Sequence, residues 1–256
     1  GGFLHDSFGG VFFTHLYGIF FSRCILKKPT VIFSQSIGPF KNKLYECIVM
    51  FILRKLDYIL IREPISYYYV SKFITNRISL TADLAFLLPV VDQNRINQIC
   101  LSEGISLSKR IVGVSLRMWR FKSNESCEQY LRAVAAGCDF LIQEYGVQVI
   151  FVSMSKGLKL FDSDQDMARR TKMLMNQKSS TVILSNRYNS EEMKGVISRC
   201  SIFVGTRMHS NIFAFSMCVP VLAIAYISKT QGIMKMLNQD AWICDIETIK
   251  VDILKD

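Results

Sequence analysis

The sequence lacks the short motifs that mark several large classes of protein. It contains no GxxxxGK[ST] phosphate loop, which excludes a P-loop protein, and no G-x-G-x-x-G, which argues against a nicotinamide cofactor. None of its eight cysteines forms a C-x-x-C pair, and it has only three histidines, so a zinc cluster of normal ligand spacing is absent. We therefore expect neither a metal nor an organic cofactor.

Glycine and proline are also scarce. The 256 residues include 14 glycines and 5 prolines, and 50% of the chain is apolar, which excludes collagen and extended disorder. This length is enough for one large domain or two modest ones. Most cysteines stand beside apolar residues, a setting typical of buried, reduced thiols in a cytosolic protein.

Acidic residues are fewer than basic ones, 21 against 31, which gives a net charge of +10. Such a balance favours an anionic partner: a phosphorylated substrate, a membrane surface or a nucleic acid. The aromatic residues stand mostly within apolar runs, without the interleaved Lys and Arg of nucleic-acid motifs, so we expect no nucleic-acid partner.

No uninterrupted apolar run has the length of a membrane-spanning helix. Segment 11–26 is interrupted by His15 and Arg23, and the uncharged run 210–228 is divided by Pro220. We expect a cytoplasmic protein with peripheral contact to the inner face of a membrane, and no crossing of it. The opening Gly1-Gly2 resembles the middle of a domain, so we also expect an N-terminal piece to be missing.

Short apolar runs alternate with helical patterns along the whole chain. Continuous apolar strands between helices predict parallel sheets, covered by helices in the second half. We expect a junction near Pro89, with Rossmann-like domains at 1–92 and 93–256. The expected strands are 30–34, 58–61, 78–80, 111–115, 147–153, 181–184, 201–204 and 221–226. The expected helices are 41–53, 65–73, 125–144, 162–175, 190–199, 209–217 and 229–237.

The most informative stretch joins strand 201–204 to helix 209–217. With Thr206 as the N-cap, the first-turn amides would form an anion site, to which Arg207 adds a planar charged fork. His209 would then occupy the third helical position, where it can exchange a proton near neutral pH. The alternative interpretation is an ordinary cap with a surface arginine and a packed histidine.

Two further cations follow strands. Arg117 comes after strand 111–115 and Lys229 after strand 221–226, so both are expected at the same sheet edge as Arg207. Trp119 would wall the pocket. Each cation has a simpler alternative, a solvated surface side chain.

Polar strand ends in the first half could bind a hydroxyl-rich acceptor such as a sugar. Ser36 lies in a strand-to-helix loop, and Asp6 follows the glycine pair. Plain turn chemistry explains either one equally well. Glu63 and Asp83 either brace a positive charge or cap helices.

Taken together, these residues resemble the polysaccharide pyruvyl transferase family. The segments that carry the resemblance, over nearly the whole chain, are Gly1-Gly2 with Asp6, 36–39, 62–66, 81–83, 115–117, 205–210, and Tyr226 with Lys229 and Gly232. The resemblance implies a glycosyltransferase-B-like fold, with two Rossmann-like domains facing across a cleft and the N-terminal, acceptor-side domain truncated. It implies transfer of a pyruvyl group from phosphoenolpyruvate, the donor substrate, to a sugar or lipid-linked oligosaccharide, with formation of a ketal.

The same resemblance assigns site residues. The family's donor-binding arginine falls on Arg117, and its Arg-x-His pair falls on Arg207 and His209. We predict His209 as the general acid or base. The predicted substrate-binding residues are Arg117, Arg207, Thr206, Ser210, Lys229, Ser36 and Asp6.

Two other functions stay open at this stage. One is a nucleotide-sugar-dependent glycosyltransferase or epimerase of similar fold, which needs a ribose-binding carboxylate such as Asp245 or Glu247. The other is a non-catalytic subunit of glycan assembly at a membrane surface, suggested by the net charge and by segment 11–26.

Overall fold

The computed structural model describes residues 4–5, 9–155, 163–185 and 187–250. It has two compact units, each with its own parallel sheet. The first unit comprises Gly1–Leu84 and Ile227–Asp240, and the second comprises Ala85–Tyr226 and Ala241–Asp256. Alternating strands and helices with parallel pairing confirm the α/β class and the Rossmann-like fold.

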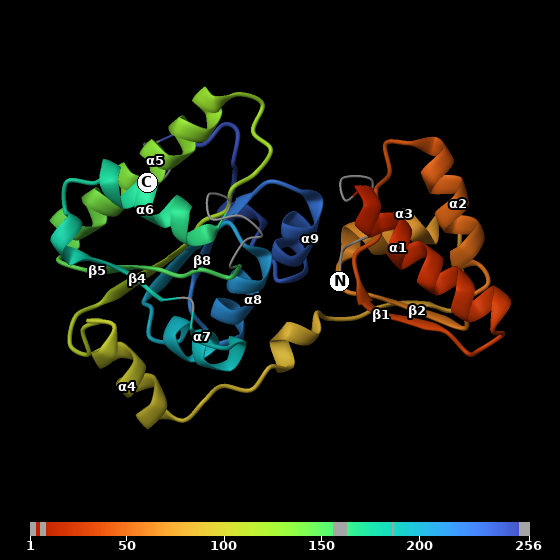
Figure 1. Cartoon of the computed structure of the whole chain (residues 1–256), viewed down its shortest axis with the longest axis horizontal. Coiled ribbons are helices and arrows are strands. Elements are labelled where there is room, and N and C mark those ends of the chain that lie inside the picture. The colour runs from red at the N-terminus through yellow and green to blue at the C-terminus, as the bar shows by residue number, and fades with distance from the viewer. Residues whose placement is uncertain (1–3, 6–8, 156–162, 186, 251–256) are drawn as a thin grey trace. The chain divides into compact units, whose positions relative to one another are not determined.

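The first unit has a three-stranded sheet in the order β1-β2-β3, formed by Val31–Gln35, Tyr58–Ile61 and Ile78–Leu80. Figure 1 shows α1 and α2 lying along one side of β1 and β2. Asn42 caps α2 by accepting hydrogen bonds from two first-turn amides. The helices of this unit are α1 (Gly9–Phe20), which continues as the π-helix Phe21–Ile25, α2 (Lys43–Leu53), α3 (Pro64–Ser71) and α9 (Ser228–Met236).

The second unit has a six-stranded sheet in the order β6-β5-β4-β7-β8-β9. Its strands are β4 (Ile111–Ser115), β5 (Gln148–Phe151), β6 (Thr181–Ile183), β7 (Ile202–Gly205), β8 (Val221–Ala225) and β9 (Ile243–Asp245). The strand order is that of a doubly wound dinucleotide-binding sheet, and its direction of winding reverses between β4 and β7. Ligands of such sheets bind outside the carboxyl ends of the strands at this reversal.

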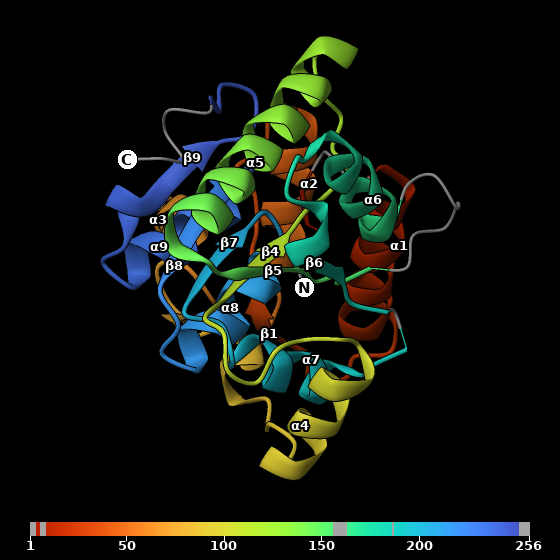
Figure 2. The ribbon, with the colours of Figure 1, turned by 90° about the vertical axis from the view of Figure 1, so that its left-hand side faces the viewer.

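Helices cover both faces of the second sheet. Figure 2 shows α5 and α6 on one face and α7 and α8 on the other. These helices are α5 (Asn124–Tyr145), α6 (Asp164–Leu174), α7 (Ser190–Ile197) and α8 (Met208–Ser216); α4 (Gln93–Ser102) packs on α7. Short 3₁₀ turns occupy Leu84–Leu87, Lys178–Ser180 and Asp240–Trp242.

Strand β4 lies at the centre of the second unit, and all five of its residues are buried. Gly113 is needed in this strand because a Cβ there would lie 2.5 Å from the ring of Phe203 on β7. Strands β4 and β7 therefore pack closely together, and the direction of winding reverses between these two strands.

The division into units differs from the expected one at 92/93. The first segment of the first unit ends at Leu84, and residues 227–240 also belong to this unit, where α9 packs on α3. The pattern also left two α-helices and one strand unpredicted. They are α1, which is apolar nearly all round, α4, which is mostly polar, and the short edge strand β9.

The structure also shows the state of the thiols, the grouping of metal-ligating side chains and the length of the apolar helices. All eight cysteines carry free thiols, and five of them are buried. In the part of the chain that the structure describes, no group of three or more metal-ligating side chains comes together. None of the helices described is both long enough and apolar enough to cross a bilayer.

Candidate functional site

The candidate site lies at the carboxyl ends of β5, β4, β7 and β8, four neighbouring strands of the second unit. Arg117 follows β4 and Arg207 follows β7, so the two arginines stand on either side of the reversal. The backbone amide of Thr206 donates to the carbonyl of Ser115, which extends the ladder between these strands up to the site. The topology thus places the two guanidinium groups at the position where doubly wound sheets bind ligands.

Arg207 is held by a buried carboxylate, that of Asp164. Its Nε lies 3.1 and 3.0 Å from the two oxygens of Asp164, and its NH2 bonds the same group. The Asp164 side chain is fully buried, while Arg207 keeps 19% of its side chain exposed. The backbone amides of Met154 and Ser155, after β5, also donate to Asp164 at 2.9 and 3.0 Å. The ion pair between Arg207 and Asp164 fixes the plane of the guanidinium group. It leaves the two N–H donors of NH1 for another partner.

Arg117 is held by aromatic groups. Its NH1 donates to the hydroxyl of Tyr226, and its Cζ lies 4.7 Å from the Tyr226 ring and 5.4 Å from the Trp119 ring. The two rings pack on each other at 4.4 Å. Among the described residues, no group accepts from the buried Nε of Arg117. Trp119 therefore packs beside Arg117, and the buried Nε of Arg117 is a donor that a ligand would satisfy.

The two arginines are close enough to affect each other. Burial is the largest effect and lowers the pKa of Arg117, and the positive charge of Arg207 lowers it further, while Tyr226 and Asp164 raise it. Burial also raises the pKa of Tyr226, which the two arginines oppose. Arginine stays protonated at neutral pH despite such shifts, so the edge carries two positive charges and one negative charge.

Thr206 does not cap the helix, and that prediction was wrong. It is fully buried, and its hydroxyl lies 2.7 Å from that of Tyr130. The N-cap is Arg207, whose side chain makes no capping bond, and α8 begins at Met208. The strand continues one residue further than expected, so the side chain of Thr206 faces inward.

Ser210 is also fully buried. Its hydroxyl lies 2.6 Å from that of Ser115 and donates to the carbonyl of Arg207 at 2.7 Å. Ser210 therefore bonds the backbone of the turn between β7 and α8 and stabilises that turn.

His209 is exposed at the second position of α8, beside Arg207 in sequence. The expected third position was wrong for the same reason as the Thr206 cap. The side chain of the N-cap Arg207 makes no bond to the first-turn amides of α8, and unpaired amides at a helix start favour an anion. The imidazole of His209 is thus accessible to solvent at the N-terminal end of α8, the end predicted from the sequence.

In the first unit, Ser36 is buried and forms a hydrogen bond with an arginine. Its hydroxyl accepts from Nε of Arg62 at 2.8 Å, and Asp83 pairs with NH1 of the same arginine. Asp83 thus braces a positive charge, and Glu63 is the N-cap of α3, so each of the two proposed roles is observed once.

Two predicted residues stand apart from this description. Lys229 is the second residue of α9 and belongs to the first unit, so its place beside Arg117 stays a prediction. Asp6 lies outside the described residues.

A cavity of about 510 Å³ borders the aromatic wall of the site. Its lining includes Trp119, Arg120 and Phe121 from the segment after β4, and Arg170 from α6. Glu247 stands near this segment, with one oxygen accepting from the amide of Lys122 at 3.3 Å. Trp119 thus lies both beside Arg117 and in the lining of this cavity.

A family model for polysaccharide pyruvyl transferases matches residues 1–228. The chain belongs to this family. The amylovoran biosynthesis protein AmsJ of Erwinia amylovora is 28% identical to this pyruvyl transferase family member over 257 residues, covering 94% of the chain and 61% of AmsJ.

Solved structures share the fold of this family member. The S. aureus MnaA–UDP structure matches with a TM-score of 0.61 and 11% identity, over 91% of this chain and 60% of MnaA. The UDP-GlcNAc 2-epimerase of Methanocaldococcus jannaschii matches with a TM-score of 0.59 and 11% identity, over 93% of this chain and 64% of the epimerase. At such identities the likeness shows the fold alone. The chain spans less than two thirds of each of these relatives.

Sequence reasoning missed Asp164 and the contact of Tyr226 with Arg117. Asp164 follows the N-cap Ser163 at the first position of α6, where an acidic residue is ordinary helix-start chemistry. The sequence points to Tyr226 only through the resemblance to the family. Only the sheet order brings the ends of β5 and β8 to the two arginines.

We expect Asp164→Asn to lower the free energy of unfolding by about 2–3 kcal/mol, less than the 3–5 kcal/mol typical of a broken buried pair because Arg207 reaches solvent. Urea unfolding followed by circular dichroism measures this loss. Asp166→Asn, in the same helical turn, is the matched control, with an expected change under about 1 kcal/mol. Equal losses in the two variants would show that the pair does not hold Arg207 in place.

Proposed function

We propose that this chain transfers a pyruvyl group from phosphoenolpyruvate to a sugar of a cell-surface polysaccharide or its precursor, forming a ketal. The observation that carries the proposal is the pair Arg117 and Arg207 at the reversal of a doubly wound sheet, in a chain of the pyruvyl transferase family. Two fixed guanidinium groups suit a small molecule that bears both a carboxylate and a phosphate.

The donors available at the site match such a ligand. The Asp164 pair occupies Nε and NH2 of Arg207, so NH1 faces the ligand in this proposal. The buried Nε of Arg117, without a partner among the described residues, and the amides at the start of α8 add further donors. A buried donor left unsatisfied costs about 1–3 kcal/mol, which an anionic ligand recovers.

The proposed reaction forms and breaks a balanced set of bonds. A proton adds to the methylene carbon of phosphoenolpyruvate, and one sugar hydroxyl forms a bond to the neighbouring carbon as it loses its proton. The bond from that carbon to the phosphate oxygen then breaks, and a second sugar hydroxyl closes the ketal as it also loses a proton. Of the two protons released, one balances the proton added to carbon and the other leaves with phosphate; no oxidant is involved.

His209 is the proposed proton carrier. It is exposed at the end of the site where the first turn of α8 would bind the phosphate. An imidazole can give a proton to carbon and take one from a hydroxyl near neutral pH. Arg117 and Arg207 stabilise the charge that develops on the departing phosphate. The scheme requires no metal.

The acceptor is proposed to be a sugar, free or in a lipid-linked oligosaccharide. The family match supports a polysaccharide or sugar acceptor in general. Asp6 and the loop of Ser36 are the acceptor residues we propose, and Lys229 is the proposed point charge for the phosphate. Of these, Ser36 acts through Arg62, because its own hydroxyl is already bonded to that arginine.

Phosphate release tests the proposal. We expect the chain to release phosphate from phosphoenolpyruvate only with a sugar acceptor present, either soluble or lipid-linked, and mass spectrometry to find one pyruvyl ketal per phosphate. Phosphate release without a ketal product would contradict pyruvyl transfer.

Thermal unfolding separates the proposal from the nucleotide-sugar alternative. A ligand at 100 times its Kd stabilises the folded state by about 2.7 kcal/mol. We expect phosphoenolpyruvate to raise the Tm and UDP-GlcNAc to leave it unchanged. The reverse result would favour a glycosyltransferase or epimerase, and no shift with either would favour the non-catalytic subunit.

A further inference from the structure

Basic residues gather where the three strands of the first unit begin. Lys27 precedes β1, Lys55 precedes β2 and Arg77 immediately precedes β3. Because the strands are parallel, these positions share one edge of the sheet. Ser36, Arg62 and Asp83 follow the same strands and lie at the opposite edge, so the basic cluster is separate from the candidate acceptor residues.

This cluster lines a cavity of about 520 Å³. Five of its six lining residues are cations, namely Arg23, Lys27, Arg54, Lys55 and Arg77; the sixth is Cys24. Asp57 neutralises part of this charge through its ion pair with Arg23 at 3.1 Å. Arg23 also donates to the carbonyl of Lys55 at 2.6 Å, which ties the π-helix to the loop before β2.

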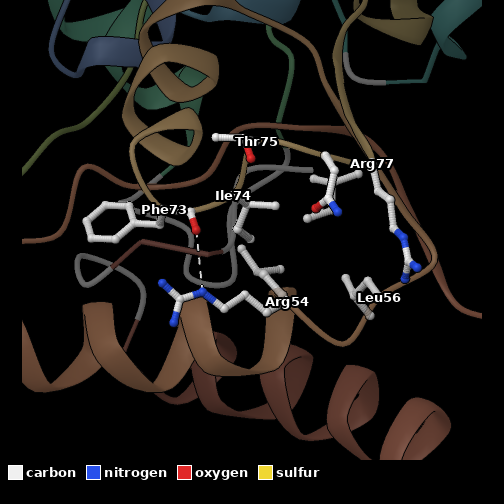
Figure 3. A pocket seen from close by; sticks show the side chains of 9 residues that line it. Arg54, Leu56, Phe73, Ile74, Thr75 and Arg77 are labelled. Atoms are coloured by element: carbon white, nitrogen blue, oxygen red, sulfur yellow. Dashed lines mark hydrogen bonds between the residues drawn. The ribbon is translucent and has the colours of Figure 1, made fainter.

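A second cavity of about 350 Å³ shares Arg54 and Arg77 with the first, and buried apolar residues such as Leu56 and Ile74 are part of its lining. Figure 3 shows the two guanidinium groups at opposite ends of this cavity, with Leu56 and Ile74 between them. Arg54 is held there by its hydrogen bond to the carbonyl of Phe73 at 3.4 Å. The two cavities together form a basic rim, with Arg54 and Arg77 common to both.

Exposed apolar side chains continue from this rim. Ile25 and Leu26, next to the lining residues Cys24 and Lys27, are 56% and 51% exposed. Phe51 is 57% exposed, and Nζ of Lys55 lies 4.6 Å above its ring. Tyr17 stacks on Phe21 at 5.7 Å, and both are exposed. Such a cluster of exposed aromatic and aliphatic groups beside cations is uncommon on a surface that meets only water.

We propose that this basic–apolar surface, formed by Tyr17, Phe21, Ile25, Leu26 and Phe51 with the five lining cations, docks the protein on an anionic lipid bilayer. Lipid phosphates pair with the cations, and the apolar side chains enter the boundary between headgroups and acyl chains. A soluble anion or a nucleic acid would satisfy the cations but leave Ile25 and Leu26 in water. An amphiphilic surface satisfies both.

Co-sedimentation of the full chain with vesicles tests this. We expect binding to vesicles of one part phosphatidylglycerol and two parts phosphatidylcholine, and weak binding to phosphatidylcholine alone. The variant Lys27→Asn, Lys55→Gln, Arg77→Asn should bind about 100-fold more weakly, at about fivefold per charge. Asparagine suits positions 27 and 77 because their φ angles are +52° and +61°.

The matched control removes three exposed charges from the second unit: Lys109→Gln, Arg110→Gln, Lys178→Gln. It should bind within about threefold of the parent, because only charges near the bilayer are unscreened over a Debye length of about 8 Å. Equal loss in both triple variants would show attraction by net charge alone and overturn the proposal, as would absent binding by the parent.

A second pair of variants tests the apolar contribution. Ile25→Ser with Leu26→Ser should weaken vesicle binding about tenfold. Leu101→Ser with Met173→Ser, which replaces two even more exposed side chains of the second unit, should not change it. All four variants should unfold at the parent's Tm within a few degrees. Weaker vesicle binding by a variant that keeps the parent's Tm would support the proposal. Equal losses of vesicle binding in the two apolar variants would contradict it. No phosphoenolpyruvate enters these assays, so their outcome is independent of the proposed reaction.

Discussion

Replacing His209 with alanine is expected to lower turnover of phosphoenolpyruvate by about 10²–10⁴-fold, the usual contribution of general acid–base catalysis. Binding of phosphoenolpyruvate should change less than about threefold, because Arg117, Arg207 and the amides of α8 remain in place. Single-turnover phosphate release measures the first quantity, and calorimetry measures the second.

His15→Ala is the matched control for this variant. His15 is also exposed and lies on a helix, but it belongs to α1 of the first unit. Its replacement should leave turnover of a soluble acceptor unchanged. If His209→Ala turned over at the parent's rate, the proton carrier would have to be another group, whereas a loss of phosphoenolpyruvate binding would make His209 a ligand-binding residue.

Arg207→Lys is expected to weaken binding of phosphoenolpyruvate by about 10–100-fold, the worth of one hydrogen bond to a charged group. Lysine keeps the positive charge but not the planar fork that bonds both oxygens of Asp164. The ammonium group would pair with Asp164 and no longer present an oriented donor to the ligand. Calorimetric titration with phosphoenolpyruvate measures the change.

The control for this variant is Arg95→Lys. Arg95 bonds Glu192 through Nε and NH2, at 2.8 and 2.6 Å, and is farther from the candidate site at the start of α4. We expect unchanged affinity in this variant. Unchanged affinity in Arg207→Lys would mean that charge alone, without the guanidinium fork, accounts for the role of residue 207.

Several strands could be predicted from the sequence to the residue. The bounds of β2, β3 and β4 agree with the apolar runs at 58–61, 78–80 and 111–115. These runs are short, rich in β-branched residues and bounded by polar or turn residues, so local pattern suffices. The start of α8 was missed by one position because Thr206 is a good cap by type but its hydroxyl is used by Tyr130, 76 residues away.

The placement of α9 shows a different limit. Its residues follow β8 directly, and the pattern could only assign them to the unit of that strand. The structure assigns them to the first unit, where α9 packs on α3. Gly232 permits this contact, since a Cβ there would lie 2.2 Å from a carboxylate oxygen of Glu63. Packing between segments far apart in sequence leaves no periodic signal along the chain.

The sequence by itself determined the α/β class, the strand-to-helix segments that bear Arg117, Arg207 and His209, and the family to which these residues point. Local pattern is enough for these because apolar periodicity and turn residues act over a few positions. Only the tertiary structure decided the partners of the two arginines, Asp164 and Tyr226, and the separate edge where Lys27, Lys55 and Arg77 meet. These groups are brought together by strand order, which depends on long-range packing and not on neighbours in the chain.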